Sequence, residues 1–231
     1  MARTKETTAK IAQMKTTKLD IELLGTSPLY LHGKARSYIR SEVWKQNNPR
    51  GAEPPNNINQ PANVWEQLIT SIEWLDPIEY HDDDYSLYSE EEWRRYMETN
   101  KPLLHSAKIG GAMKEVFISC YKEKTGKAGT DLQRALNFTD KGFPIEAGWY
   151  EPESIIIPGS GINRAPVVCN RNILHDWKCE VSIIVPESIF PAETIISILR
   201  NAGWMIGLST NHKNGYGRFV IGNVIQTAMQ I

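Results

Sequence analysis

Residues 203–219, GWMIGLSTNHKNGYGRF, are the stretch that decides the fold. They follow Pro191–Gly203, which has proline in its first turn and glycine at its end and therefore predicts a helix. They lead into Gly217–Ile225, which predicts the last strand. The loop between, Gly207–Phe219, holds three glycines and two fixed cations but no acid. Because glycines let the backbone approach a ligand and unhindered amides attract anions, we predict that this loop contacts phosphate.

Hydrophobic patterns upstream of this loop predict four more elements. Lys18–Gly25 alternates like a half-buried strand, and apolar residues recur at helical spacing from Ser106 until Gly126. Ser154–Pro158 predicts a short strand and Trp177–Val185 a longer one. The order strand, helix, strand, strand, helix, strand is that of an α+β, ferredoxin-like (RRM-like) domain. In that fold two helices back a four-stranded antiparallel sheet.

The chain is predicted to consist of a basic N-terminal arm, residues 1–17, and a single domain, residues 18–231. The domain carries a large insertion, residues 33–101, between its first strand and its first helix. Within the insertion, residues 46–63 contain four prolines and six asparagines and predict a long irregular loop. Trp65–Leu75 is compatible with a short helix.

Charge is segregated along the chain, although the net charge of its 231 residues is only −1. Met1–Lys18 carries five Lys and Arg against one acid, and His32–Arg50 carries five against one. Glu73–Glu98 carries ten acids against two arginines. Because a polyanion responds to the field within roughly 8–10 Å, these local blocks matter more than the sum. The opposite blocks also predict head-to-tail packing of copies, which would build an open filament.

The remaining composition is typical of a cytoplasmic protein. No apolar run reaches the roughly 18 residues of a membrane span, and we predict no membrane contact. Cys120, Cys169 and Cys179 are odd in number and widely spaced, so they predict reduced thiols rather than a disulfide or a metal site. We expect no cofactor.

The pattern from Gly203 to Phe219, a helix end followed by glycines, a cation and GYGRF, resembles the glycine-rich signature of the RAMP superfamily of CRISPR-associated RNA-binding proteins. His105–Val116, HSAKIGGAMKEV, is similar to the small-residue stretch that opens the first helix in that superfamily. The resemblance covers mainly residues 102–225, and the layout is similar to that of the backbone subunits of Cascade-type complexes. The length fits a compact, phage-encoded member acting in a bacterial host cell.

This resemblance implies a non-catalytic protein that coats a guide RNA or a transcript. It would do so as repeated subunits of a helical ribonucleoprotein filament, within an RNA-guided or CRISPR-like complex. The implied partners are single-stranded, guide-like RNA, target DNA or RNA paired to it, and further copies of the chain along the RNA.

The candidate RNA-binding residues come from the first strand end and the basic block after it, the first helix, the hairpin before residue 177, and the glycine-rich loop. They are His32, Lys34, Arg36, Arg40, Trp44, Lys45, Lys108, Lys114, Arg164, Arg171, Ser209, Asn211, His212, Lys213, Asn214, Tyr216 and Arg218. The cations and amides would contact phosphate, while Trp44 and Tyr216 offer faces on which bases stack. Trp177 and Trp204 are expected in the core.

Two other functions stay open. A single-turnover endoribonuclease of the same fold would use His32 or His212 as its base. A phage structural protein would keep the fold without nucleic acid. We favour binding without catalysis, since His32 has no second histidine or tyrosine at an obvious spacing. The run His81–Asp84 could ligate Mg²⁺, but consecutive acids are more often a solvated turn, so we predict no metal.

Overall fold

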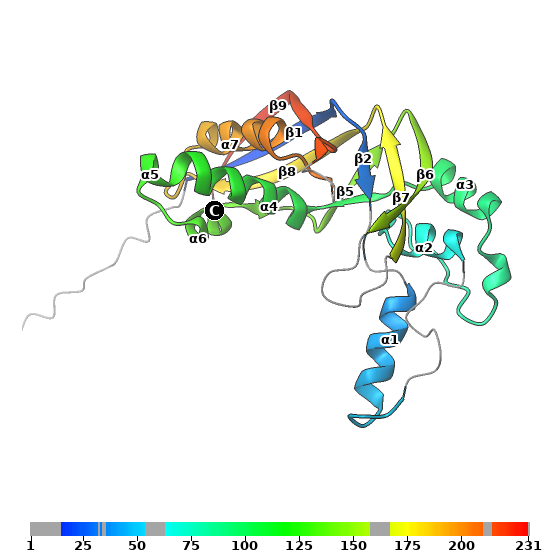
Figure 1. Cartoon of the computed structure of the whole chain (residues 1–231). Helices are drawn as coiled ribbons and strands as arrows, with labels where there is room; N and C mark the ends of the chain where they lie inside the picture. The colour runs from blue at the N-terminus through cyan, green and yellow to red at the C-terminus, as the bar shows by residue number, and fades with distance from the viewer. Residues whose placement is uncertain are drawn as a thin grey trace, which may run out of the picture.

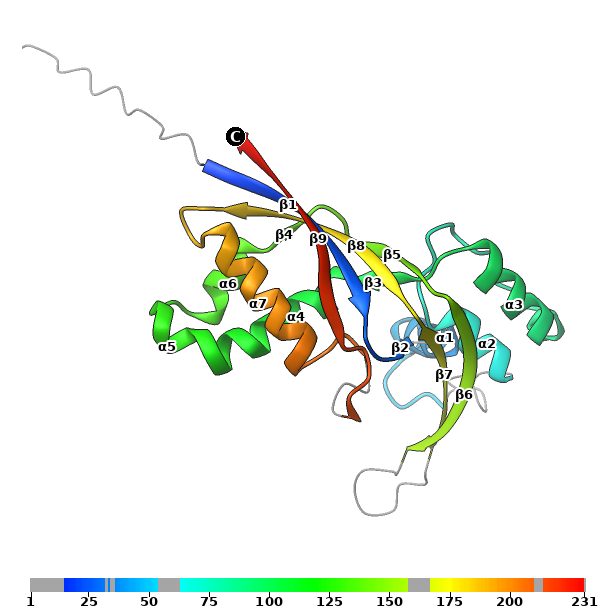
Figure 2. The same cartoon turned by 90° about the horizontal axis from the view of Figure 1, so that it is seen from above.

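The computed structural model describes residues 15–31, 33, 36–53, 63–157, 167–209 and 214–230. These residues form an α+β fold, as the sequence predicts, but with two antiparallel sheets in place of the single predicted one (Figure 1, Figure 2). The strand order in the larger sheet is β3-β5-β8-β1-β9, and β4 also pairs with β8. Its strands are β1 (Lys15–Gly25), β3 (Leu103–His105), β4 (Asn137–Phe138), β5 (Gly142–Glu146), β8 (Lys178–Pro186) and β9 (Phe219–Gln230).

The core lies between one face of this sheet and a layer of helices (Figure 1). β1 alternates, so that Leu19, Ile21 and Leu23 are buried while the polar residues between them face the other side. The helical layer consists of α4 (Ser106–Val116), the π-turn η2 (Phe117–Tyr121), α5 (Lys122–Thr125), α6 (Gly129–Ala135) and α7 (Ala192–Met205). The run that starts at α4 ends at Gly126, with φ of +64°, where the sequence predicts the end.

Along the chain, β1, α4, β5, β8, α7 and β9 follow one another in the predicted order of strands and helices. The prediction for the second strand is wrong. The sequence analysis assigns Ser154–Pro158 to that place, but the strand beside β8 is β5, with Ile145 opposite Cys179. Phe143 and Ile145 bury alternate side chains of β5 in the main core, which fixes its register. The ferredoxin-like arrangement stays an interpretation of this connectivity.

The predicted strand at residue 154 belongs instead to the smaller sheet, with strand order β2-β7-β6. Its strands are β2 (Leu29–Leu31), β6 (Trp149–Ile157) and β7 (Val167–His175). One face packs on the insertion through Asn172, whose side chain accepts a hydrogen bond from Trp93 Nε1 at 2.7 Å. The same amide donates to the Leu68 carbonyl oxygen at 2.8 Å. A buried amide with both ends satisfied fixes the position of the insertion on this sheet.

The insertion is more helical than the sequence predicts. Its helices are α1 (Arg36–Asn47), α2 (Val64–Thr70), the 3-10 turn η1 (Tyr85–Leu87) and α3 (Glu90–Thr99). Asn63 and Ser89 start α2 and α3 by accepting hydrogen bonds from backbone amides through their side chains. Trp74 and Trp93 are buried, so these tryptophans pack rather than face a ligand. Of the irregular loop predicted at 46–63, residues 54–62 lie outside the described residues.

The first residue of β1 and the last residue of β9 differ slightly from the predicted strand ends. β1 begins at Lys15, inside the predicted basic arm, and residues 1–14 of that arm lie outside the described residues. β9 runs on to Gln230, five residues past the predicted end. Within the part of the chain that the structure describes, no helix is long and apolar enough to cross a membrane.

The face of the larger sheet that points away from α4 and α7 mixes charged side chains with exposed aliphatic ones such as Val220 and Ile225. Glu146 accepts from Lys101 at 2.5 Å and from Lys178 at 2.9 Å, and these two cations lower the pKa of Glu146 to about 2. By strand alternation, none of the described residues on this face is aromatic. The base-stacking surface that an RRM presents on its sheet is therefore missing here.

Candidate nucleic-acid interface

The glycine-rich loop folds back on itself after α7. The Leu208 amide donates to the Gly217 carbonyl oxygen at 2.9 Å, and the Gly217 amide donates to the Pro28 carbonyl oxygen at 2.7 Å. Gly217 has φ of +71°, and a Cβ there would lie 2.4 Å from the Ser209 nitrogen. Gly215 has φ of +85° with no atom near its missing Cβ. The packing of the loop against Ser209 therefore requires glycine at position 217, whereas a side chain at position 215 would meet no neighbouring atom.

The described side chains of Ser209, Tyr216 and Arg218 in this loop make contacts inside the molecule. The Tyr216 ring packs edge-on against Tyr30 with centroids 4.3 Å apart, and the buried Ser209 hydroxyl accepts from the Tyr30 amide. Arg218 donates from Nη1 to the Trp204 carbonyl oxygen at 2.7 Å, at the C-terminal end of α7. A cation in that place satisfies a helix carbonyl through one of the five N–H donors of its guanidinium. Asn214 is exposed; Asn211, His212 and Lys213 lie outside the described residues.

A groove runs between α4 and the start of this loop, with a volume of about 430 Å³. It is lined by Lys108, Gly111, Ala112, Glu115, Ile206, Gly207, Leu208 and Ser209. The α4 residues share one stripe of the helix, and a Cβ at Gly111 would meet no atom. Of the two adjacent glycines of this helix, Gly111 leaves open space, whereas Phe138 lies 3.6 Å from a Cβ built at Gly110.

Lys108 is the cation of this groove. Burial lowers the pKa of its ammonium group below the ordinary value for lysine. Among the described residues, no carboxylate forms an ion pair with it. Lys114, the other predicted cation of α4, lies on a different side of the helix, toward Gly129 of α6. The structure thus places Lys108 at the groove and Lys114 away from it.

A second hollow, of about 440 Å³, adjoins the groove at Lys108, which lines both. Its walls come from β2, α1, α2, β3 and the segment before η1. They are formed by Leu31, Gly33, Ile39, Thr70, Ser71, Ile72, Glu73, Tyr80, Leu103, His105 and Lys108. The glycine-rich loop, the first turns of α4 and the insertion therefore meet in one concave region.

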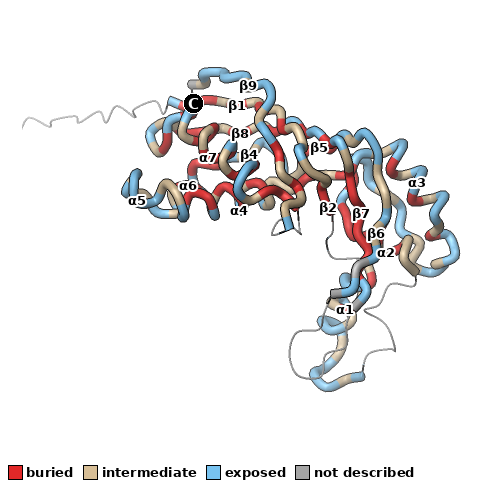
Figure 3. Tube along the Cα trace, turned by 45° about the horizontal axis from the view of Figure 1, so that its top comes forward, coloured by how far each residue is buried: buried red, intermediate tan, exposed pale blue. Residues whose placement is uncertain are grey.

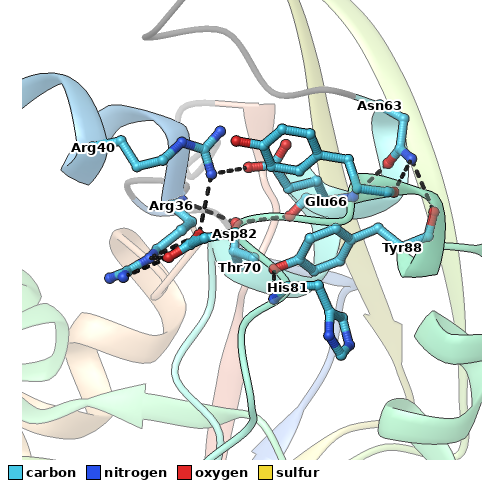
Figure 4. Close-up of polar contacts among 9 residues, drawn as sticks. Arg36, Arg40, Asn63, Glu66, Thr70, His81, Asp82 and Tyr88 are labelled. Carbon is cyan, nitrogen blue, oxygen red and sulfur yellow. Dashed lines mark hydrogen bonds and ion pairs between the residues drawn. The ribbon is translucent and has the colours of Figure 1, made fainter.

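Arg36 and Arg40 of α1 form a polar latch with Glu66 of α2 and Asp82 of the segment before η1, shown in Figure 4. Arg36 makes two short hydrogen bonds to Asp82, at 2.8 and 3.1 Å to Oδ2, and Arg40 Nη1 lies 2.9 Å from Oε1 of Glu66. Glu66 is completely buried. Hydrogen bonds from Arg36 hold the pKa of Asp82 below its ordinary value. We name these four residues the α1 latch.

The α1 latch also bears on the charge blocks. The sequence predicts that the basic and acidic blocks pair between copies; within one chain, Arg36 and Arg40 of the basic block already pair with Asp82 of the acidic block. The reason is spatial, because α1 folds against α2 and the acidic segment. Arg36 and Arg40, predicted to bind RNA, therefore have intramolecular carboxylate partners in this structure.

The other predicted residues of α1 lie farther along the helix, which extends away from both sheets (Figure 1). Lys45 pairs with Glu42 at 2.9 Å on the exposed side. Trp44 is half-buried beside Ile39 and Val43 in a shallow apolar hollow of about 350 Å³. His32 and Lys34, just before this helix, lie outside the described residues.

Arg171 of β7 is 8% exposed, and its CZ atom lies 5.7 Å from the centre of the Tyr30 ring. Within the described chain, its Nε and Nη1 groups have no hydrogen-bond partner. It lies opposite Glu153 on β6. Arg171 thus lies beside Tyr30 of β2, the ring that packs against Tyr216 of the glycine-rich loop, while Arg164 lies outside the described residues.

Comparisons with known proteins give no family for the chain. No family model matches it, and no curated protein matches it. Among solved structures it is similar to a chain in a structure described as the cryo-EM structure of the Type III-B Cmr-beta bound to cognate target RNA. The TM-score is 0.48 at 12% sequence identity, and the alignment covers 94% of this chain and 61% of that one. The chain therefore spans about three-fifths of the length of that neighbour.

The structure also locates residues that the sequence analysis missed. Trp204, predicted for the core, is 79% exposed on the last turn of α7, whereas Trp177 is buried as predicted. Ser71 and His105 line the second hollow although no motif marks them. In the run predicted as a solvated turn, Asp82 pairs with Arg36 and Arg40, and His81 contacts Glu92 at 2.8 Å. Within the described ranges, no cluster of three or more His, Cys, Asp or Glu is arranged to hold a metal.

Proposed function

We propose that this protein binds single-stranded RNA without cleaving it, along the groove between α4 and the glycine-rich loop. The observation that carries the proposal is Lys108, a cation without a carboxylate partner among the described residues. It faces a groove whose walls include exposed backbone at Gly111. A phosphate would find there a charge and close access to main chain, which are what backbone binding needs. The sheet face, which carries no aromatic side chain among the described residues, offers no competing surface for stacked bases.

The resemblance of GYGRF to the RAMP signature extends the proposal to repeated subunits in an RNA-guided, CRISPR-like complex. β9 supports contacts between copies, because Phe219–Gln230 contains no charge and no proline. One side of β9 pairs with β1, and no described strand pairs with the other side. Most of β9 is exposed (Figure 3). Edge strands of this length that lack charges pair readily with another strand.

Lys108→Gln is expected to weaken binding of a single-stranded RNA about ten-fold at low salt, which corresponds to about 1.4 kcal/mol. It should also reduce the slope of log Kd against log salt by about 0.7, because one phosphate contact is lost. Fluorescence anisotropy with a labelled oligonucleotide at several salt concentrations measures both quantities. Lys114→Gln is the matched control, since it removes the same charge from the same helix outside the groove.

Equal effects of the two substitutions would show that only net charge matters and that the groove is not the site. Denaturing gels of the same incubations report on cleavage. RNA that stays at full length agrees with binding alone, whereas shortened RNA would favour the endoribonuclease.

Repeated subunits predict that complexes grow with RNA length. Analytical ultracentrifugation with RNAs of increasing length should show a stepwise rise in mass for the wild-type protein. Ile225→Lys, which puts a charge on the exposed edge strand, should reduce cooperativity while leaving the affinity of a single copy for a short RNA unchanged. One complex size at every RNA length would exclude the filament.

A further inference from the structure

Trp204 has the most exposed large hydrophobic side chain in the part of the chain that the structure describes. It lies on the last turn of α7 and is 79% exposed, whereas Ile195, Leu199 and Ala202 of the same helix are buried in the core. A single exposed hydrophobic residue is common on protein surfaces, so the ring alone assigns nothing. The groups around it decide what it can bind.

Two arginines lie next to this tryptophan. Arg200 is exposed and precedes Trp204 by four residues, so the two side chains share one face of α7. Arg218, at the start of β9, donates one hydrogen bond to the Trp204 carbonyl oxygen at 2.7 Å and keeps further N–H donors (Figure 2). Among the described residues, neither arginine forms an ion pair with a carboxylate. The arginines of the α1 latch and of α3, in contrast, all have acid partners.

The acids near this end of α7 lie to its sides. Glu193 shares the face with Arg200, but it accepts a hydrogen bond from Gln226 and precedes Trp204 by eleven residues, roughly 16 Å along the helix. That distance exceeds the roughly 8–10 Å over which exposed charges act in salt. Glu115 of α4 lines the groove on the other side. An anion beside Trp204 is therefore best placed on the side of the two arginines.

The exposed ring is continuous with the groove of the proposed function. Ile206, which lines that groove, follows Trp204 by two residues. Because consecutive Cα atoms are 3.8 Å apart, the two Cα atoms lie within about 8 Å of each other. A single strand that leaves the groove at this end therefore meets the tryptophan next.

An exposed ring beside unpaired cations suits a single-stranded nucleic acid. Such proteins bind the backbone with positive side chains and stack bases on aromatic rings, whatever the sequence of the strand. A tryptophan that contacts another protein copy would have the same exposure. The two cations without acid partners favour a polyanion over that alternative.

We propose that Trp204 stacks one base of the single-stranded RNA, while Arg200 and Arg218 contact the phosphates beside that base. This inference rests on the proposed function for the identity of the ligand. It adds a stacking residue outside the groove, so the ring and the groove can be tested separately.

The test is fluorescence anisotropy of the full chain with a labelled oligouridine that is short enough to bind one copy. Trp204→Ala should weaken binding at least about five-fold, and Trp204→Phe should recover most of that loss because it keeps an aromatic face. Both variants should keep the melting temperature within about 2 °C of wild type, since the side chain is exposed. Trp149→Ala is the control. Trp149 is 49% exposed but lies on β6 of the other sheet, stacked on His175, and its variant should bind RNA as wild type does.

Two further measurements separate stacking from charge. Arg200→Gln should reduce the slope of log Kd against log salt by about 0.7, whereas Trp204→Ala should weaken binding and leave the slope unchanged. Photocrosslinking with RNA that carries 5-iodouridine, followed by mass spectrometry, should attach RNA to the peptide that contains Trp204.

Wild-type affinity of Trp204→Ala, or an equal loss in Trp149→Ala, would overturn the inference. If Trp204→Ala binds the short RNA normally but its complexes no longer grow with RNA length, Trp204 contacts a protein copy and base stacking is wrong. Loss of affinity in Lys108→Gln but not in Trp204→Ala leaves the proposed function standing and removes the stacking residue. Loss in Trp204→Ala, with Lys108→Gln equal to Lys114→Gln, keeps the stacking residue and removes the groove. No RNA binding by the wild-type chain overturns both.

Discussion

Arg40→Met is expected to lower the free energy of unfolding by about 3 kcal/mol, because it leaves the Glu66 carboxylate buried without its cation. Methionine keeps most of the volume of the arginine stem, so the loss reports on charge rather than on a cavity. Glu66 is fully buried and lies 2.9 Å from Arg40, whereas Asp82 keeps its second partner, Arg36. Urea denaturation followed by circular dichroism measures the change.

Two further variants make this experiment specific. Arg94→Met removes an exposed partner of Glu90 and should cost less than about 1 kcal/mol. The double variant Arg40→Met, Glu66→Gln should recover much of the lost stability, since a neutral amide replaces the stranded charge. If Arg40→Met instead leaves stability unchanged and weakens RNA binding, Arg40 contacts phosphate as the sequence analysis first suggested.

The α1 latch shows why the sequence could not reveal that Arg36 and Arg40 have carboxylate partners. The partners of Arg36 and Arg40 lie 46 and 42 residues away at Asp82. Nothing local in the basic block reveals them. The residues next to an arginine in sequence do not show whether its side chain faces solvent or pairs with a distant acid.

Elements with strong hydrophobic periodicity were predictable. β1, β8 and α7 each bury one regular face, and their predicted ranges agree with the structure to within a few residues. α1 was not predicted, because Ile39 and Val43 remain exposed and the helix is held by polar contacts instead. Its stability comes from tertiary structure rather than from an apolar stripe.

Sheet membership and side-chain direction were the parts that local patterns could not settle. The apolar run at 154–157 is a strand as predicted, but it pairs with β7, and β5 takes the place beside β8. Trp204 follows Gly203 at the end of α7 and falls one position outside the buried stripe. At the candidate site, Lys108 was identified from sequence, whereas Ser71 and His105 meet it only through the fold.

The glycine-rich loop gives the second large effect, at Gly217. Gly217→Ala is expected to lower the free energy of unfolding by about 2–4 kcal/mol, since it combines a positive φ with a close contact. The new Cβ would lie 2.4 Å from the Ser209 nitrogen, and neither side can move freely. The Gly217 amide donates a hydrogen bond to the Pro28 carbonyl oxygen, and the Gly217 carbonyl oxygen accepts one from the amide of Leu208, the residue before Ser209. Thermal and urea denaturation measure the loss.

Gly215→Ala is the matched control, because its φ of +85° is similarly positive but no atom lies within 4 Å of the added Cβ. It should cost only about 1 kcal/mol, the strain of a left-handed alanine. Under conditions in which both variants are folded, Gly217→Ala should also weaken RNA binding, because the loop that walls the groove is displaced. Gly215→Ala should bind RNA as wild type does. Equal losses of stability at the two positions would show that backbone conformation alone, and not the packing against Ser209, makes Gly217 necessary.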